Sequence, residues 1–252
     1  MVDIGCSRSY LTWLRHCAQL QLSSDVRLMS VSPKHPHGQQ PIVRDGAPLD
    51  KARRVVILLH GRGASAESML TIAQKLRLDD TAFLAPQAYG HTWYPQSFLV
   101  PLSQNEPALS SALRKVGEVV SIAEDAGHPP ENVAILGFSQ GACLASEFVA
   151  RNPQRYGGLI AFSGGLIGSH DSPQSADGGK LFDYDGSLDG TPVFLGCSDV
   201  DPHIPVERVQ KTGDVLKKLG ADVQVEIYEG MGHTIVQDEL DQAERLLQKL
   251  PV

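Results

Sequence analysis

From residue 54 onward, short apolar runs alternate with longer stretches that carry apolar residues at helical spacing. The first run, 55–59, is continuously apolar, as in a strand buried on both faces of a sheet. The predicted strands cover 55–59, 81–85, 132–136, 158–163, 192–196 and 223–228. The predicted helices cover 65–77, 107–126, 140–151, 206–219 and 235–249. This order predicts an α/β fold with a mainly parallel sheet and helices on both faces.

A chain of 252 residues suits one domain with a full core, with or without an appendage. We expect the domain over 38–252 and interpret 1–37 as an N-terminal extension, either disordered or the product of an upstream start. Segment 30–50 is polar and interrupted by prolines, which leaves room for one short edge strand at most.

Two stretches interrupt the alternation. Residues 86–105 contain several prolines together with Trp93, Tyr94 and Phe98, and this aromatic loop is typical of a substrate wall. Residues 164–191 are rich in Gly, Asp and Ser, and either a binding loop or a disordered surface excursion fits them.

The charge balance argues against nucleic-acid binding. Lys and Arg number 22 against 29 Asp and Glu, for a net charge of −7, and no basic run is present. No apolar run approaches the roughly 18 residues of a membrane span. The N-terminus also lacks the pattern of a secretory signal. We therefore predict a cytoplasmic protein that spans no membrane.

The cysteines argue against a metal site. Cys6, Cys17, Cys143 and Cys197 lack the close, paired spacing that structural zinc requires, and no metal is predicted. Cys143 and Cys197 fall in apolar segments and are expected to be buried thiols, which fits a reducing compartment.

The strongest chemical signal is the sequence GFSQG at 137–141. It follows the buried strand at 132–136 and opens the helix at 140–151, the strand–turn–helix setting of a nucleophile elbow. Small residues are needed two positions before and after Ser139, because strand and helix approach each other closely there, and Gly137 and Gly141 meet that need. This context predicts Ser139 as the nucleophile, rather than an incidental serine in a glycine-rich turn.

A serine nucleophile needs a base, which in this fold class follows an acid in the chain. Of the histidines after Ser139, His233 lies in a glycine-rich loop between the last strand and the last helix, and it is the predicted base. Asp199 and Asp201 compete for the role of the acid that orients the imidazole. Counting from the glycine of the preceding strand favours Asp199, whereas counting back from the closing proline favours Asp201. We take Asp201, with Asp199 supporting the loop by hydrogen bonds.

The first strand ends in the sequence HGRG, at the sheet edge where the elbow is expected. The backbone N–H groups of Arg62 and Gln140 are therefore the predicted oxyanion hole. Residues 61–66 also match a dinucleotide-binding fingerprint. We reject dinucleotide binding because the acid that binds the ribose should follow the second strand, whereas Asp79 and Asp80 precede it.

Together these stretches resemble the phospholipase/carboxylesterase family, which includes acyl-protein thioesterases and small bacterial carboxylesterases. The matching segments are LLHGRG (58–63), TWY (92–94), GFSQGA (137–142), SGGL (163–166), DPHIP (201–205) and YEGMGHT (228–234). The resemblance implies an α/β-hydrolase fold without a separate cap domain and a triad of Ser139, Asp201 and His233. It also implies Arg62 and Gln140 as oxyanion donors and an acyl site near Trp93, Tyr94 and Phe98.

We therefore predict a serine carboxylesterase that hydrolyses carboxylic esters through an acyl-enzyme without any cofactor. One alternative is an acyl thioesterase or lysophospholipase for longer acyl chains, and another is a non-catalytic binding protein with the same fold. The expected partner is a small ester or thioester, and the expected assembly is a monomer or homodimer.

Overall fold

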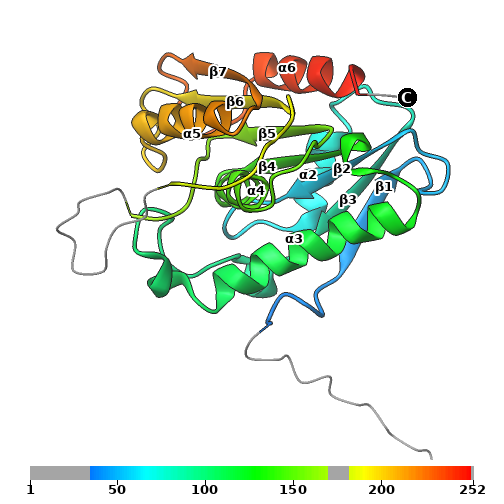
Figure 1. The fold of residues 1–252 in the computed structure, drawn as a ribbon, viewed down its shortest axis with the longest axis horizontal. Coiled ribbons are helices and arrows are strands. Elements are labelled where there is room, and N and C mark those ends of the chain that lie inside the picture. The colour runs from blue at the N-terminus through cyan, green and yellow to red at the C-terminus, as the bar shows by residue number, and fades with distance from the viewer. Residues whose placement is uncertain (1–34, 170–181, 251–252) are drawn as a thin grey trace, which may run out of the picture. The chain divides into compact units, whose positions relative to one another are not determined.

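Among the residues that the structure describes, the strands form one seven-stranded sheet with the order β1-β3-β2-β4-β5-β6-β7 (Figure 1). This computed structural model describes residues 35–169 and 182–250, all within the unit Val31–Val252. The strands are β1 (Ile42–Gly46), β2 (Arg54–Leu59), β3 (Thr81–Pro86), β4 (Val133–Phe138), β5 (Gly158–Phe162), β6 (Pro192–Ser198) and β7 (Asp222–Tyr228). Every neighbouring pair is parallel except β1 with β3. The predicted mainly parallel sheet and the short edge strand are confirmed.

Helices cover both faces of this sheet (Figure 1). One face carries α3 (Ala108–Asp125), α4 (Gln140–Arg151) and α5 (Val206–Lys218), and the other carries α2 (Ala66–Ala73) and α6 (Gln237–Gln248). Short 3₁₀ turns are η1 (Tyr89–His91), η2 (Leu102–Asn105) and η3 (Pro130–Asn132). The described residues form no separate cap domain, and none of their helices has the length and apolar character to cross a bilayer.

Strand β2 shows why the sheet needs cover on both sides. Val55, Ile57 and Leu59 face the core under α3, α4 and α5, whereas Val56 and Leu58 face the core under α2 and α6. All five side chains are fully buried. Because successive side chains in a strand point to opposite faces, a continuously apolar run is stable only between two layers.

The predicted boundaries hold to within two residues except at the end of α2, which was expected to reach residue 77. The helix ends at Ala73. Leu76 and Leu78 are both buried in the core beneath this helix. A helix would turn residues two apart to different sides, so the chain must leave the helical path to bury both.

Strand β6 runs two residues past its predicted end at 196. Cys197 and Ser198 continue the ladder with Ile227 and Tyr228 of β7. Cys143 and Cys197 are both buried and unpaired, as predicted.

The segment before β1 packs against α3 and the 86–105 loop. His35 Nδ1 lies 2.8 Å from the hydroxyl of Ser111. The His37 ring is buried and accepts a 2.9 Å hydrogen bond from the amide of Tyr89. Of the predicted extension, residues 1–34 lie outside the described part of the chain.

The predicted loop 164–191 is described only at its two ends. The amide of Gly168 donates to the carbonyl of Phe98 at 2.7 Å, and Leu188 donates to Leu219 at 2.7 Å. These contacts join the start of this loop to the aromatic 86–105 loop and its end to the segment after α5. The prediction about its middle falls on residues 170–181, which lie outside the described residues.

Helix α6 begins directly after the loop that carries His233, and a buried carboxylate caps it. Glu239 accepts a 3.0 Å hydrogen bond from the amide of Val236, and its side chain is fully buried. Its other oxygen has no hydrogen-bond partner among the described residues. Burial raises the pKa of Glu239 to about 7, although the bond from Val236 acts in the opposite direction.

The replacement Glu239→Gln should stabilise the protein at alkaline pH and change little in acid. The folded pKa exceeds the unfolded one, so stability from this group is complete below pH 4.5 and is lost as pH rises through about 7. The neutral amide removes a cost of about 3 kcal/mol above that window. Urea unfolding at pH 5 and pH 8 measures the difference. Asp214→Asn on the exposed side of α5 is the control, and an equal gain for E239Q at both pH values would contradict the argument.

Two glycines let α4 approach the sheet. A Cβ on Gly137 would collide with the backbone of Gly141, and a Cβ on Gly141 would collide with the carbonyl oxygen of Leu59. Both collisions are with backbone atoms, which cannot rotate away. The start of α4 therefore depends on the absence of side chains at these positions.

Gly141→Ala should destabilise the fold by about 1–3 kcal/mol, because α4 must shift away from β2. Gly117 in α3 is the matched control, since a Cβ there meets only the Phe148 ring at 3.6 Å. Gly117→Ala should stabilise by about 0.5–1 kcal/mol through helix propensity. Urea denaturation of both variants measures the contrast, and similar effects of the two substitutions would contradict it.

Candidate active site

Ser139 occupies the turn between β4 and α4 with φ 55° and ψ −118°, a strained conformation for a residue with a side chain. Its amide donates to the carbonyl of Phe162 at 2.9 Å, and its carbonyl accepts from Cys143 at 3.0 Å. These bonds, together with the close packing at Gly137 and Gly141, hold the strained turn. The turn places the serine at the carboxyl edge of the sheet.

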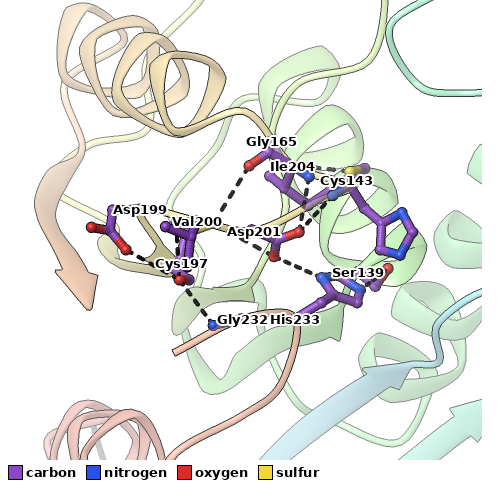
Figure 2. A network of polar contacts seen from close by, with 12 residues as sticks. Ser139, Cys143, Gly165, Cys197, Asp199, Val200, Asp201, Ile204, Gly232 and His233 are labelled. Atoms are coloured by element: carbon purple, nitrogen blue, oxygen red, sulfur yellow. Dashed lines mark hydrogen bonds and ion pairs between the residues drawn. The ribbon is translucent and has the colours of Figure 1, made fainter. Parts of the chain in front are cut away.

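His233 lies between Ser139 and Asp201 (Figure 2). Its Nε2 is 2.9 Å from the Ser139 Oγ, and its Nδ1 is 2.7 Å from Oδ2 of Asp201. An ionised carboxylate only accepts hydrogen bonds, so Nδ1 carries the proton and Nε2 is left to accept from the serine hydroxyl. The structure thus brings together the three residues that the sequence predicted as a triad.

Asp201 is held as a carboxylate. Its side chain is fully buried, and Oδ1 accepts hydrogen bonds from the amides of His203 at 2.8 Å and Ile204 at 3.0 Å. Burial acts to raise its pKa, but the hydrogen bond from His233 and those two amides outweigh it and keep the pKa below the ordinary value. The negative charge therefore persists beside the imidazole at neutral pH.

Asp199 lies apart from His233 in Figure 2. It is exposed, and its carboxylate accepts a 2.8 Å hydrogen bond from the amide of Gly230. The neighbouring Ser198 hydroxyl accepts from the amide of Gly232 at 3.1 Å. Ser198 at the end of β6 and Asp199 directly after it thus hold the loop that carries His233 by hydrogen bonds.

Two further rings border His233, and sequence reasoning did not single out either of them for the site. Phe138 packs on the imidazole with ring centroids 5.0 Å apart, and His203 meets it edge to face at 4.9 Å. The sequence could have indicated these two rings by their positions. Phe138 directly precedes Ser139, and His203 follows Asp201 by two residues.

Arg62 and Gln140, whose backbone amides are the predicted oxyanion donors, line the same cavity as Ser139. Within 35–169 and 182–250, neither amide donates to a protein acceptor. Gln140 is the first residue of α4, where helical N–H groups have no partner inside the helix. Both donors therefore remain available for an oxyanion, the role predicted from the sequence.

The side chain of Gln140 holds the aromatic loop in place. Its Oε1 accepts from the amide of Trp93 at 3.0 Å, and its Nε2 donates to the carbonyl of Tyr94 at 2.8 Å. The Trp93 indole is fully buried and donates to the carbonyl of His60 at 2.8 Å. Of the three predicted substrate-binding residues, Tyr94 and Phe98 line the cavity, whereas Trp93 packs beneath the loop.

The cavity beside Ser139 and His233 has a volume of about 650 Å³, a size suited to a small molecule. Cys143 lies in its wall, where burial raises the pKa of the thiol to about 12 and keeps it protonated. An open groove of about 780 Å³ along α3 and α4 contains none of the three predicted triad residues. The described residues contain no group of three or more side chains suited to hold a metal ion.

The fold is that of an α/β hydrolase. The model of the phospholipase/carboxylesterase family matches residues 46–251, and the chain belongs to that family of esterases and thioesterases. A crystal structure of a phospholipase/carboxylesterase from Dyadobacter fermentans is 42% identical with a TM-score of 0.77, over 83% of this chain and 97% of that one. A crystal structure of the esterase PE8 is 30% identical with a TM-score of 0.67, over 84% and 98%. Acyl-protein thioesterase 1 of Saccharomyces cerevisiae is 27% identical over 239 residues, which cover 82% of this chain and 97% of that protein.

The contrast between the two carboxylates predicts unequal effects of matched substitutions. Asp201→Asn should slow labelling of Ser139 by a fluorophosphonate probe by about 10²–10⁴-fold, because the amide favours the wrong imidazole tautomer. Asp199→Asn should slow it by less than about tenfold, since this residue only supports the loop. The rate of probe incorporation measures both effects. Equal losses in the two variants would contradict the assignment of Asp201.

Proposed function

We propose that this protein is a serine carboxylesterase in which Ser139 is the nucleophile, His233 the general base and acid, and Asp201 the orienting carboxylate. One observation carries the proposal. A single imidazole lies within hydrogen-bond distance of both the serine hydroxyl and a buried carboxylate. A serine hydroxyl requires such a base, oriented by a carboxylate, to become nucleophilic at neutral pH.

In the first half of the reaction, His233 takes the proton of Ser139 as the oxygen attacks the ester carbonyl. The tetrahedral intermediate carries a negative charge, which the amides of Arg62 and Gln140 receive. Asp201 stabilises the imidazolium that forms. His233 then gives the proton to the leaving alcohol, and the acyl group remains on the serine.

In the second half, water replaces the alcohol. His233 takes a proton from the water, which attacks the acyl carbonyl in the same oxyanion hole. The intermediate collapses, the carboxylic acid leaves, and the proton returns to the Ser139 oxygen. Every proton transfer in this sequence passes through His233.

The substrate occupies the cavity beside these residues. Tyr94, Phe98 and Ile204 give its wall an apolar character that suits an acyl chain or an apolar alcohol. The cavity volume of about 650 Å³ suits small esters.

A second candidate is an acyl thioesterase or lysophospholipase acting on longer chains. The observation in its favour is the similarity to the yeast protein named acyl-protein thioesterase 1. The same triad chemistry applies to both classes, because only the leaving group and the length of the acyl chain differ. The choice therefore rests on the substrate and not on the triad.

The replacement Ser139→Ala should reduce turnover of 4-nitrophenyl butyrate by about 10³-fold or more, because the acyl-enzyme cannot form. Release of 4-nitrophenol measures the rate, and circular dichroism checks that the variant is folded. A fluorophosphonate probe should label the wild type and leave the variant unlabelled. Ester turnover retained in the alanine variant would refute the proposal, and an unlabelled wild type would favour a non-catalytic binding protein.

A panel of 4-nitrophenyl esters with acyl chains from two to sixteen carbons separates the two candidates. A carboxylesterase with this cavity should show its highest kcat/KM on the shorter chains. A maximum at twelve carbons or more would favour the long-chain alternative. The same chains presented as thioesters give the comparison of leaving groups.

A further inference from the structure

The cavity has an unusual charge pattern for so acidic a chain. The protein carries a net charge of −7, yet among the described residues that line the cavity there is no aspartate or glutamate. The lining contains Arg62 and the two histidines His203 and His233. The described lining therefore contributes one permanent positive charge and no carboxylate of its own, the nearby Asp201 being paired with His233 behind the wall.

Arg62 has no charged partner among the residues that the structure describes. Its guanidinium donates to the carbonyls of Pro95 at 2.9 Å and Gln96 at 2.7 Å, and both acceptors are neutral. Its Cζ lies 5.9 Å from the centroid of the Tyr94 ring. Among residues 35–169 and 182–250, no carboxylate lies within 4.0 Å of this side chain, which is exposed to solvent.

The chemistry of arginine then indicates what could complete this site. A guanidinium has five N–H donors, of which the two carbonyls engage two. The others can bind a carboxylate, whose two oxygens match the planar fork. The two loop carbonyls fix the orientation of the guanidinium before a ligand arrives, so little side-chain entropy is lost on binding.

We propose that the natural substrate is an ester that carries a carboxylate, and that Arg62 is the residue that selects it. This inference rests on the proposed esterase function and adds a substrate class to it. The carboxylate of the substrate lies near the guanidinium while the ester carbonyl lies between Ser139 and the oxyanion donors. Arg62 then has two roles in the reaction. Its backbone amide donates a hydrogen bond to the oxyanion, and its guanidinium binds the carboxylate of the substrate.

The side chain of Arg62 could instead act only as a tether between the oxyanion turn and the 86–105 loop. A tether acts on every substrate alike, whereas a charge acts on anionic substrates. The quantity that separates the two roles is the ratio of kcat/KM for an anionic ester to that for its neutral counterpart. Damage to the oxyanion turn cancels in this ratio.

Two pairs of substrates place the charge on either side of the ester. Mono-4-nitrophenyl adipate and 4-nitrophenyl hexanoate differ only by a carboxylate in place of the terminal methyl group of the acyl chain. The esters 3-carboxy-4-nitrophenyl butyrate and 4-nitrophenyl butyrate differ by a carboxylate on the leaving group. In at least one pair, the anionic-to-neutral ratio should fall by about tenfold or more in Arg62→Gln.

Arg62→Lys keeps the charge but loses the fork, so it should retain more of the ratio than Arg62→Gln. Added salt should raise KM for the anionic member in the wild type and leave KM for the neutral member nearly constant. Arg53→Gln is the matched control, because this exposed arginine pairs with Asp80 at 3.6 Å and does not line the cavity. Its ratios should equal those of the wild type.

If the ratios of both pairs are the same in wild type, Arg62→Gln and Arg62→Lys, Arg62 is a tether only and the inference is overturned. The failure of the proposed function looks different. In that case the wild type would hydrolyse neither member of either pair, and Ser139 would take up no fluorophosphonate probe.

Discussion

The site depends on the close approach of α4 to the sheet. Because Gly137 and Gly141 carry no side chains, the helix starts almost against the backbone of β2, and the connecting residue is forced to positive φ. That residue is Ser139, held by its backbone bonds to Phe162 and Cys143. The strain is tolerated because the strands beneath are fully buried and hydrogen-bonded on both sides. The proposed nucleophile therefore projects from a tightly packed turn between β4 and α4.

The parallel sheet then supplies the partners of the serine. Strands that run in one direction end at one edge, so the ends of β4, β6 and β7 bring Ser139, Asp201 and His233 together from distant parts of the sequence. The ladder between β6 and β7 extends to the pair Ser198 and Tyr228, and the Ser198 hydroxyl and Asp199 carboxylate bind the following loop. The proposed base, His233, and the proposed acid, Asp201, thus stand on loops joined to one hydrogen-bonded pair of strands.

Much of this arrangement could be predicted from the sequence, because the deciding signals are local. A buried run before GFSQG and a glycine-rich loop around His233 identify the nucleophile and the base. The acid was ambiguous, since the sequence does not show that β6 continues past Gly196 to pair with β7. Trp93 could not be separated from its aromatic neighbours by pattern alone, because its buried place depends on contacts with Gln140 and His60. Contacts between segments far apart in the chain do not produce a periodic pattern in the sequence, so they could not be predicted from it.

The 86–105 loop is hydrogen-bonded to both residues whose amides are the proposed oxyanion donors. Gln140, whose backbone amide is a proposed oxyanion donor, binds the backbone of the aromatic loop with its side-chain amide. The guanidinium of Arg62, which follows the neighbouring strand β2, holds the same loop through the carbonyls of Pro95 and Gln96. Each proposed oxyanion donor therefore belongs to a residue whose side chain is hydrogen-bonded to the loop that forms part of the cavity wall. A substrate that displaces this wall also displaces the donors, so the fit of the remote part of an ester changes the stabilisation of charge at its carbonyl.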